Sequence, residues 1–146
     1  MLPLYHTHTK EETQKIGKTL AQELVPGVLV TLAGDLGAGK TTLTQGILEA
    51  LGAEKPYTSP TFVIMKEYSL PVASQNGIKR VYHVDTYRIE AKDLEHLGFE
   101  EWCSDLNGLV ILEWPKRVQK LLPEKRVDIT LIHKGQSERE IQIVQR

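Results

Sequence analysis

The residue types with the clearest chemical purpose lie together in Gly34-Asp35-Leu36-Gly37-Ala38-Gly39-Lys40-Thr41. This stretch matches the phosphate-binding loop pattern G-x-x-x-x-G-K-[ST] without a mismatch. Its glycines allow successive backbone N–H groups to point inward around a phosphate, and the helix that follows adds unpaired N–H groups. Lys40 would bring positive charge to the β- and γ-phosphates, and the Thr41 hydroxyl would ligate Mg²⁺. The stretch therefore predicts a nucleoside triphosphate site.

Two acidic residues are placed to complete such a site, because its Mg²⁺ needs oxygen ligands and an attacking water needs positioning. Glu113 closes the apolar run 109–112, and Asp85 closes the run 81–84. Ligands of α/β proteins bind at the carboxyl ends of strands. We predict Glu113 as the carboxylate that binds the metal, directly or through water, and orients the attacking water, with Asp85 as the second acid. Each acid could instead cap a turn or pair with an arginine.

Further polar and aromatic residues surround these acids. Thr61, in Ser59-Pro60-Thr61-Phe62, is a candidate to present its hydroxyl to the γ-phosphate or Mg²⁺, as switch loops do, or else simply enters a strand. His83 points to the same strand face as Asp85 and is a candidate to orient its carboxylate. Arg88 could contact phosphate or pair with Asp85. Trp114 could lie beside a nucleotide or pack into the core.

These residues must be positioned by a strand, a loop and a helix, and the hydrophobic periodicity predicts them. Two further strands, 61–68 and 79–84, are joined by a linker too short for a helical crossover, so we expect an antiparallel hairpin. The apolar run 109–112 predicts a central strand covered on both faces. Other strands are expected at 28–32, 127–132 and 140–144, and helices at 9–24, 42–51, 91–97, 100–106 and 115–122.

The predicted fold class is therefore α/β: a P-loop NTPase-like three-layer sandwich with a mixed central sheet of parallel strands and an antiparallel hairpin. We expect a single P-loop ATPase domain over residues 1–146. A hydrophobic content of 40% and a charged content of 25% are typical of soluble globular proteins. The net charge of −1 creates no general field for nucleic acid or membrane. Cys103 is the sole cysteine, which excludes an intrachain disulfide and a cysteine-rich metal site.

Some motifs are missing from the sequence, and their absence narrows the function. There is no signal-peptide core and no apolar run of about 18 residues, so we expect a cytoplasmic protein without membrane association. The sequence lacks Asn-Lys-x-Asp, the guanine reader of GTPases, which favours ATP, and it lacks Leu-Ser-Gly-Gly-Gln of transporter ATPases. It also lacks an arginine-rich lid. A small-molecule kinase and a nucleotide-dependent binding module with incidental hydrolysis remain the alternatives.

Four blocks together resemble the bacterial TsaE family, formerly called YjeE. They agree with it in order and spacing, and the similarity extends from about Thr9 to Ile143. The blocks are Gly34-Asp35-Leu36-Gly37-Ala38-Gly39-Lys40-Thr41-Thr42, Ser59-Pro60-Thr61-Phe62, His83-Val84-Asp85-Thr86-Tyr87-Arg88 and Glu113-Trp114-Pro115. The first block is shared by many families, whereas the combination is specific.

The resemblance implies a small cytoplasmic ATPase required for the threonylcarbamoyladenosine modification at position 37 of tRNAs that read codons beginning with A. Such proteins act with TsaB and TsaD, while TsaC supplies the threonylcarbamoyl-adenylate. They bind the TsaB–TsaD pair rather than transferring the group, and ATP hydrolysis is thought to reset that complex. tRNA is thus involved indirectly, and direct contact with this subunit stays open.

The resemblance also carries site residues onto this sequence. Thr41 and Glu113 match Mg²⁺-site positions, and Thr61 matches a switch-like threonine. The loop through Thr42 matches the nucleotide site, and residues near Thr9 match a segment by the adenine. Arg139 corresponds to a late arginine near the nucleotide, although the preceding Gly135-Gln136-Ser137-Glu138 departs from the family's usual Gly-Arg spacing.

Overall fold

The structure is a computed structural model that describes residues 3–146. Its middle layer is a seven-stranded sheet in the order β1-β7-β6-β2-β5-β4-β3. α1 and α2 are the longest helices, with 12 residues each, and no helix within residues 3–146 is long and apolar enough to cross a membrane. In chain order the elements are β1 (Leu4–Thr7), α1 (Lys10–Ala21), β2 (Leu29–Ala33), α2 (Lys40–Leu51), β3 (Met65–Ser69), β4 (Arg80–Asp85), α3 (Ala91–Leu97), α4 (Phe99–Cys103), β5 (Gly108–Glu113), the 3₁₀ helix η1 (Pro115–Leu121), β6 (Val127–His133) and β7 (Arg139–Gln145).

The sheet is parallel in its centre and antiparallel at both edges. The mixed sheet and the antiparallel hairpin at one edge were predicted, whereas the antiparallel pairing at the other edge was not. β2 pairs in parallel with β5 and with β6, and β4 pairs in parallel with β5. β3 forms the expected antiparallel hairpin with β4, while β7 pairs antiparallel with both β6 and β1. Every residue of β5 is buried. The unbroken apolar run in this strand therefore reflects a central position between two layers of helix.

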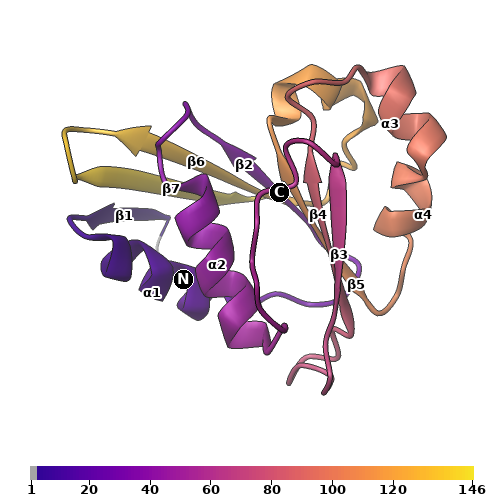
Figure 1. Cartoon of the computed structure of the whole chain (residues 1–146), viewed down its shortest axis with the longest axis horizontal. Coiled ribbons are helices and arrows are strands. Elements are labelled where there is room, and N and C mark those ends of the chain that lie inside the picture. Colours follow the sequence, from indigo (N-terminus) through magenta and orange to yellow (C-terminus); the bar gives the residue numbers. More distant parts are fainter. Residues whose placement is uncertain (1–2) are drawn as a thin grey trace.

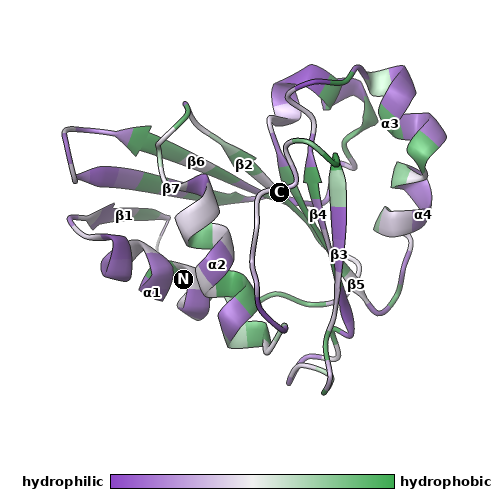
Figure 2. Ribbon diagram, in the orientation of Figure 1, coloured by the Kyte–Doolittle hydropathy of each residue, from purple (hydrophilic) through white to green (hydrophobic). Residues whose placement is uncertain are grey.

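Two apolar cores, one on each face of the sheet, hold the three layers together. Leu20, Leu43 and Ile47 of α1 and α2 pack against Val30 and Ile111 on one face. On the other face, residues of α3, α4 and η1 pack against a second set of strand residues (Figure 1). Figure 2 shows the hydrophobic residues along the central strands, with hydrophilic residues on the outer side of α1. The predicted three-layer α/β sandwich is confirmed.

α1 and α2 approach each other closely, and this contact places the beginning of α1 beside the phosphate-binding loop. A Cβ atom on Gly46 would lie 2.2 Å from the backbone oxygen of Gln14, and one on Gly17 would lie 2.4 Å from that of Leu43. Only glycine allows the two backbones to approach this far. Thr9 caps α1 as predicted, because its side chain accepts a hydrogen bond from the first turn of the helix.

The strand predicted over residues 61–68 begins later, at Met65. The preceding residues form a turn in which the carbonyl oxygen of Pro60 accepts a hydrogen bond of 2.6 Å from the Ile64 amide. Ile64 has a φ of 71°, which a strand cannot accommodate. Phe62 is consequently 79% exposed. The β-forming residue types here led to a wrong boundary, because proline and tertiary contacts outweigh local strand propensity.

Other elements also differ from the prediction. The helix expected over residues 9–24 ends at Ala21. The helix expected over residues 100–106 ends at Cys103, because Asp105 lies outside it and binds Arg80. The helix expected over residues 115–122 is a 3₁₀ helix with non-helical angles at Val118. β1 was not predicted at all, since its four residues form a strand only by pairing with β7.

Asp105 ties the beginning of β4 to the loop before β5, and its contacts predict an acid-sensitive contribution to stability. Its carboxylate accepts hydrogen bonds from Arg80 Nε at 2.8 Å, Arg80 Nη2 at 2.9 Å and the Tyr82 hydroxyl at 2.7 Å. The hydrogen bonds from Arg80 hold the pKa of Asp105 well below its usual range, although partial burial acts in the opposite direction. The carboxylate is therefore charged, and bound, throughout the neutral range.

Asp105→Asn should lower the free energy of unfolding at pH 7 by about 2 kcal/mol, the scale of a hydrogen bond to a charged group. Because the folded pKa is depressed, this stabilisation is present above the ordinary aspartate pKa of about 4 and is lost as the pH falls below it. Urea unfolding at pH 7 and at successively lower pH measures the difference between wild type and variant. A difference that stays constant as the pH falls below 4 would contradict the prediction.

Candidate functional site

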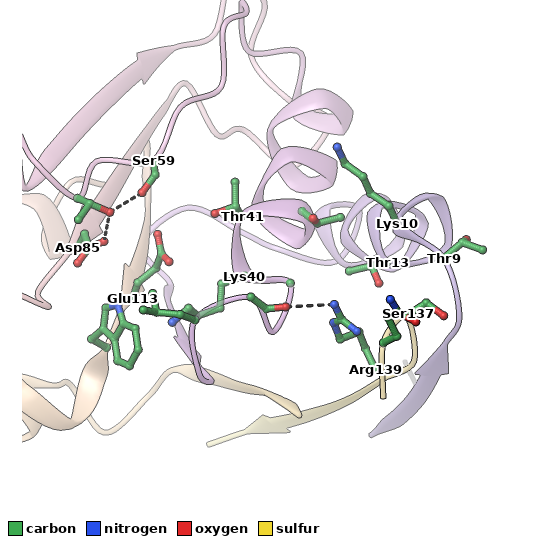
Figure 3. A pocket seen from close by; sticks show the side chains of 17 residues that line it. Thr9, Lys10, Thr13, Lys40, Thr41, Ser59, Asp85, Glu113, Ser137 and Arg139 are labelled. Atoms are coloured by element: carbon green, nitrogen blue, oxygen red, sulfur yellow. Dashed lines mark hydrogen bonds between the residues drawn. The ribbon is translucent and has the colours of Figure 1, made fainter. Parts of the chain in front are cut away.

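A cavity of about 440 Å³ opens at the carboxyl ends of the central strands (Figure 3). Its wall is formed by the loop after β2, the first turns of α1 and α2, the ends of β4 and β5, and the hairpin between β6 and β7. Most of its side chains are polar or charged. The lining residues are Thr9, Lys10, Thr13, Leu36, Gly37, Gly39, Lys40, Thr41, Thr42, Ser59, Thr61, Asp85, Glu113, Trp114, Gln136, Ser137 and Arg139.

Lys40 begins α2 and is held against the phosphate-binding loop. Gly39 precedes it with a φ of 106°, a conformation that favours glycine and that turns the chain from the loop into the helix. The Lys40 Nζ atom donates a hydrogen bond of 2.6 Å to the carbonyl oxygen of Gly34 and lies 3.3 Å from the centroid of the Trp114 ring. Lys40 is only 6% exposed. Its ammonium group would therefore have to leave these contacts to reach a phosphate.

Burial and nearby negative charges shift the pKa of Lys40 in opposite directions. Burial lowers the pKa of its ammonium group, whereas the negative charges of Glu113, Asp85 and Asp35 act to raise it. Glu113 has the largest effect among the three. The two acids singled out in the sequence thus lie close enough to Lys40 to interact with its charge, as their places at the ends of β4 and β5 suggested.

Glu113 is buried and held by a histidine. Its Oε2 atom lies 2.8 Å from His83 Nε2, and the two residues are 3% and 2% exposed. The sequence suggested that His83 orients Asp85, and this is wrong. β4 and β5 pair in parallel with His83 opposite Ile111 and Asp85 opposite Glu113, so His83 reaches the neighbouring strand instead of its own.

Asp85 is the end of a chain of hydrogen bonds that connects the turn at Pro60 to the strand. The Thr61 hydroxyl donates to Asp85 Oδ2 at 2.9 Å, and Ser59 Oγ lies 2.7 Å from Thr61 Oγ1 (Figure 3). Because the one proton of Thr61 is used on Asp85, Ser59 donates to Thr61. The Tyr87 amide also donates to Asp85 Oδ1 at 2.8 Å. Both Thr61 and Asp85 line the cavity, as expected.

Trp114 belongs to the cavity wall rather than to the core. It adopts a left-handed backbone conformation with a φ of 64°, and its carbonyl oxygen accepts a hydrogen bond of 2.7 Å from the Thr86 hydroxyl. This turn places the ring next to Lys40. Arg88, which the sequence linked to phosphate or to Asp85, instead has its guanidinium carbon 4.6 Å from the centroid of the Phe62 ring.

Arg139 reaches the phosphate-binding loop from β7. Its Nη2 atom donates a hydrogen bond of 3.1 Å to the carbonyl oxygen of Gly37 (Figure 3). It lines the cavity together with Ser137 and with Thr9 and Lys10 at the beginning of α1. The position expected from the resemblance is therefore close to the loop, even though the residues before Arg139 follow a different spacing.

Three residues of the predicted loop do not line the cavity. Gly34 takes part through its carbonyl oxygen, Asp35 acts through its charge on Lys40, and Ala38 is 1% exposed and packs in the core. Conversely, Lys10 and Thr13 line the cavity without any local signal. They reach the cavity because α1 packs closely on α2. No local pattern in the sequence predicts this packing.

The donor atoms around the cavity suit a hard cation such as Mg²⁺. They are the hydroxyl oxygens of Thr41 and Thr61 and the carboxylate oxygens of Asp85 and Glu113. Mg²⁺ in phosphate sites takes one or two carboxylates and completes its shell with phosphate oxygens and water. Across residues 3–146 no three His, Cys, Asp or Glu side chains converge on a common metal position.

Comparisons with known proteins agree on one family. The family described as threonylcarbamoyl adenosine biosynthesis protein TsaE matches residues 7–141. The tRNA threonylcarbamoyladenosine biosynthesis protein TsaE of Bacillus subtilis is 41% identical over 137 residues, which are 94% of this chain and 82% of the relative. The protein of the same name from Nostoc is 34% identical and covers 92% of this chain and 80% of the relative. The crystal structure of Bacillus subtilis YdiB superposes with a TM-score of 0.74 and 33% identity, covering 97% of this chain and 84% of that one.

Proposed function

Because this chain belongs to the TsaE family, we propose that it is the ATP-binding and ATP-hydrolysing subunit of the machinery that makes threonylcarbamoyladenosine at position 37 of tRNA. The observation that carries the proposal is the cavity itself. It joins the phosphate-binding loop, a buried lysine and two strand-end carboxylates at the carboxyl ends of the central strands. This set of groups meets the needs of a nucleoside triphosphate, which are cation charge, inward N–H groups and oxygen ligands for its metal.

The loop and Lys40 would bind the phosphates. The amides at the start of α2 and the positive end of its dipole favour negative charge at this point. Lys40 would exchange the carbonyl oxygen of Gly34 for phosphate oxygens, and Thr41 and Glu113 would hold Mg²⁺. The metal, when bound, supplies further positive charge to the phosphates. Arg139, now on the Gly37 carbonyl, lies near enough to contribute a second cation.

The acids would act on the water that attacks the γ-phosphate. Glu113 accepts a hydrogen bond from His83 at one oxygen, which leaves the other oxygen to accept from water or to bind the metal. Asp85 and Thr61 form a hydrogen-bonded pair in the same wall. Thr61 sits on a turn outside the sheet, so nucleotide binding can change its position without disturbing a strand. We assign it the role of sensing the γ-phosphate or the metal.

We infer that hydrolysis serves a complex rather than a substrate of this chain. The partners proposed are TsaB and TsaD, on which this subunit would act without transferring the threonylcarbamoyl group itself. tRNA would be involved through that complex. The catalytic groups are few and the cavity is open to solvent, so the isolated chain should hydrolyse ATP slowly.

ATP turnover measured for the chain alone, and then with TsaB, TsaD and tRNA, tests this function. We expect weak Mg²⁺-dependent release of inorganic phosphate alone and a clear increase with the partners. Phosphate transferred to a metabolite in place of water would instead support a small-molecule kinase.

Pull-down of TsaB–TsaD with and without ATP separates a switch from a simple binding module, since a switch requires nucleotide-dependent binding. Absence of ATP binding under all these conditions would refute the proposal.

A further inference from the structure

His83 and Glu113 form a buried pair next to the first turns of α2. Both face the layer formed by α1 and α2, and the Nε2–Oε2 distance is 2.8 Å. A small cavity lined by Thr41, Thr44 and Tyr57 also touches His83. The imidazole thus lies behind Glu113 as seen from the nucleotide cavity, because His83 does not line that cavity whereas Glu113 does. It is connected to the site through this carboxylate, and it shares the small cavity with Thr41 at the start of α2, which also lines the nucleotide cavity.

The surroundings of the imidazole determine which nitrogen carries its proton. Nδ1 is buried and has no hydrogen-bond partner among residues 3–146. A proton on Nδ1 would leave a buried donor unpaired, and would place the bare Nε2 lone pair against a carboxylate oxygen. Both arrangements are unfavourable. The neutral imidazole with its proton on Nε2 satisfies the pair, so His83 donates to Glu113.

We propose that His83 is a positioning residue that fixes the Glu113 carboxylate for ATP hydrolysis. The inference rests on the proposed function and adds a residue to it. The Nε2–H group occupies Oε2, and the remaining oxygen, Oε1, is the one presented to water or metal. Without this bond the carboxylate could rotate about its last torsion, whose preferences are weak. Lys40, which interacts with Glu113 by charge, would then compete for the carboxylate.

The test compares two substitutions of the same residue. His83→Leu removes the donor while keeping an apolar side chain of similar bulk, and His83→Gln keeps an N–H donor that can reach the position of Nε2. His83→Leu should lower kcat about 10- to 100-fold, the usual cost of removing a group that orients a metal-site ligand. The Kd for ATP measured without Mg²⁺ should stay nearly unchanged, and half-maximal activity should require more Mg²⁺. His83→Gln should restore most of the lost kcat.

A double-mutant cycle separates positioning from a general effect on packing. If His83 acts through Glu113, then His83→Leu should cause no further loss of kcat in a Glu113→Gln background. Val81→Ala is the matched control. Val81 is buried on the same face of β4, two residues from His83, and is not part of the site. It should lower the melting temperature and leave kcat of the folded protein unchanged.

The outcomes distinguish this inference from the function on which it rests. Wild-type protein that hydrolyses no ATP, alone or with partners, would overturn both. Wild-type turnover that falls with Glu113→Gln but not with His83→Leu would overturn the positioning role alone, as would equal losses for the leucine and glutamine variants. If leucine at this position prevents folding, His83→Met replaces it, because methionine adapts to irregular space and also lacks a donor.

Discussion

Replacing Lys40 by alanine should weaken ATP binding about 100-fold or more. One charge-assisted hydrogen bond contributes about 1.5–3 kcal/mol, and several phosphate oxygens would lose the same partner. Part of the binding free energy that Lys40 contributes is offset in the wild type. Its Nζ atom must first leave the Gly34 carbonyl oxygen at 2.6 Å and the centroid of the Trp114 ring at 3.3 Å. The net loss is expected to remain large, since the cavity interior offers few other cations. Isothermal titration with ATP and Mg²⁺ measures it directly.

Lys92→Ala is the matched control for this experiment. It removes the same charge from an exposed position. The Lys92 side chain is 73% exposed, and its Nζ atom lies 3.7 Å from Glu90 Oε2 in a surface ion pair. Its ATP affinity should equal that of the wild type. Thermal unfolding of both variants is needed, because Lys40→Ala also leaves a carbonyl oxygen without its donor. Unchanged ATP affinity in a folded Lys40→Ala protein would show that the phosphates bind elsewhere.

Glu113→Gln should retain nucleotide binding and lose ATP hydrolysis. The amide has the size of the carboxylate and can still accept a hydrogen bond from His83, so the buried pair at 2.8 Å should persist. It cannot, however, accept a proton from water or hold Mg²⁺ with a full negative charge. General base catalysis is worth about 10²- to 10⁴-fold, and kcat should fall within this range. Single-turnover measurement of phosphate release at saturating ATP gives the rate of the chemical step.

The control for Glu113→Gln is Glu49→Gln, at the far end of α2. This carboxylate is exposed and pairs with Lys18 at 3.0 Å, outside the cavity. Its loss should leave both affinity and turnover unchanged. The decisive comparison is between the kcat of each variant relative to that of the wild type. A loss of turnover in Glu49→Gln would indicate a general effect of charge. Normal single-turnover hydrolysis by Glu113→Gln would remove Glu113 from the proposed chemistry.

Much of the architecture follows from local patterns. The phosphate-binding loop, the hairpin of β3 and β4, the buried β5 and the cap at Thr9 all appear where periodicity and residue type predict them. The errors concern segments without a strong period of their own. Residues 61–64 have strand-forming types, yet Pro60 closes them into a turn, and β1 exists only because β7 provides a partner.

The site divides in the same way. Lys40, Thr41, Asp85 and Glu113 are recognisable from the sequence, because a loop pattern and a strand end are both local features. Thr61 could be named but not given a partner. Lys10 and Thr13 carry no local signal, and they enter the wall because the glycines of α1 and α2 allow the two helices to meet.

The amino-acid sequence by itself determined that this chain has a loop with the phosphate-binding pattern between a strand and a helix, and acids at two strand ends. Tertiary structure alone decided which side chains pair: His83 with Glu113, Thr61 with Asp85, and Arg139 with the Gly37 carbonyl. The physical reason is that these pairs depend on strand order and register. Both are set by the burial of whole faces of the sheet, so no short stretch of residues encodes them.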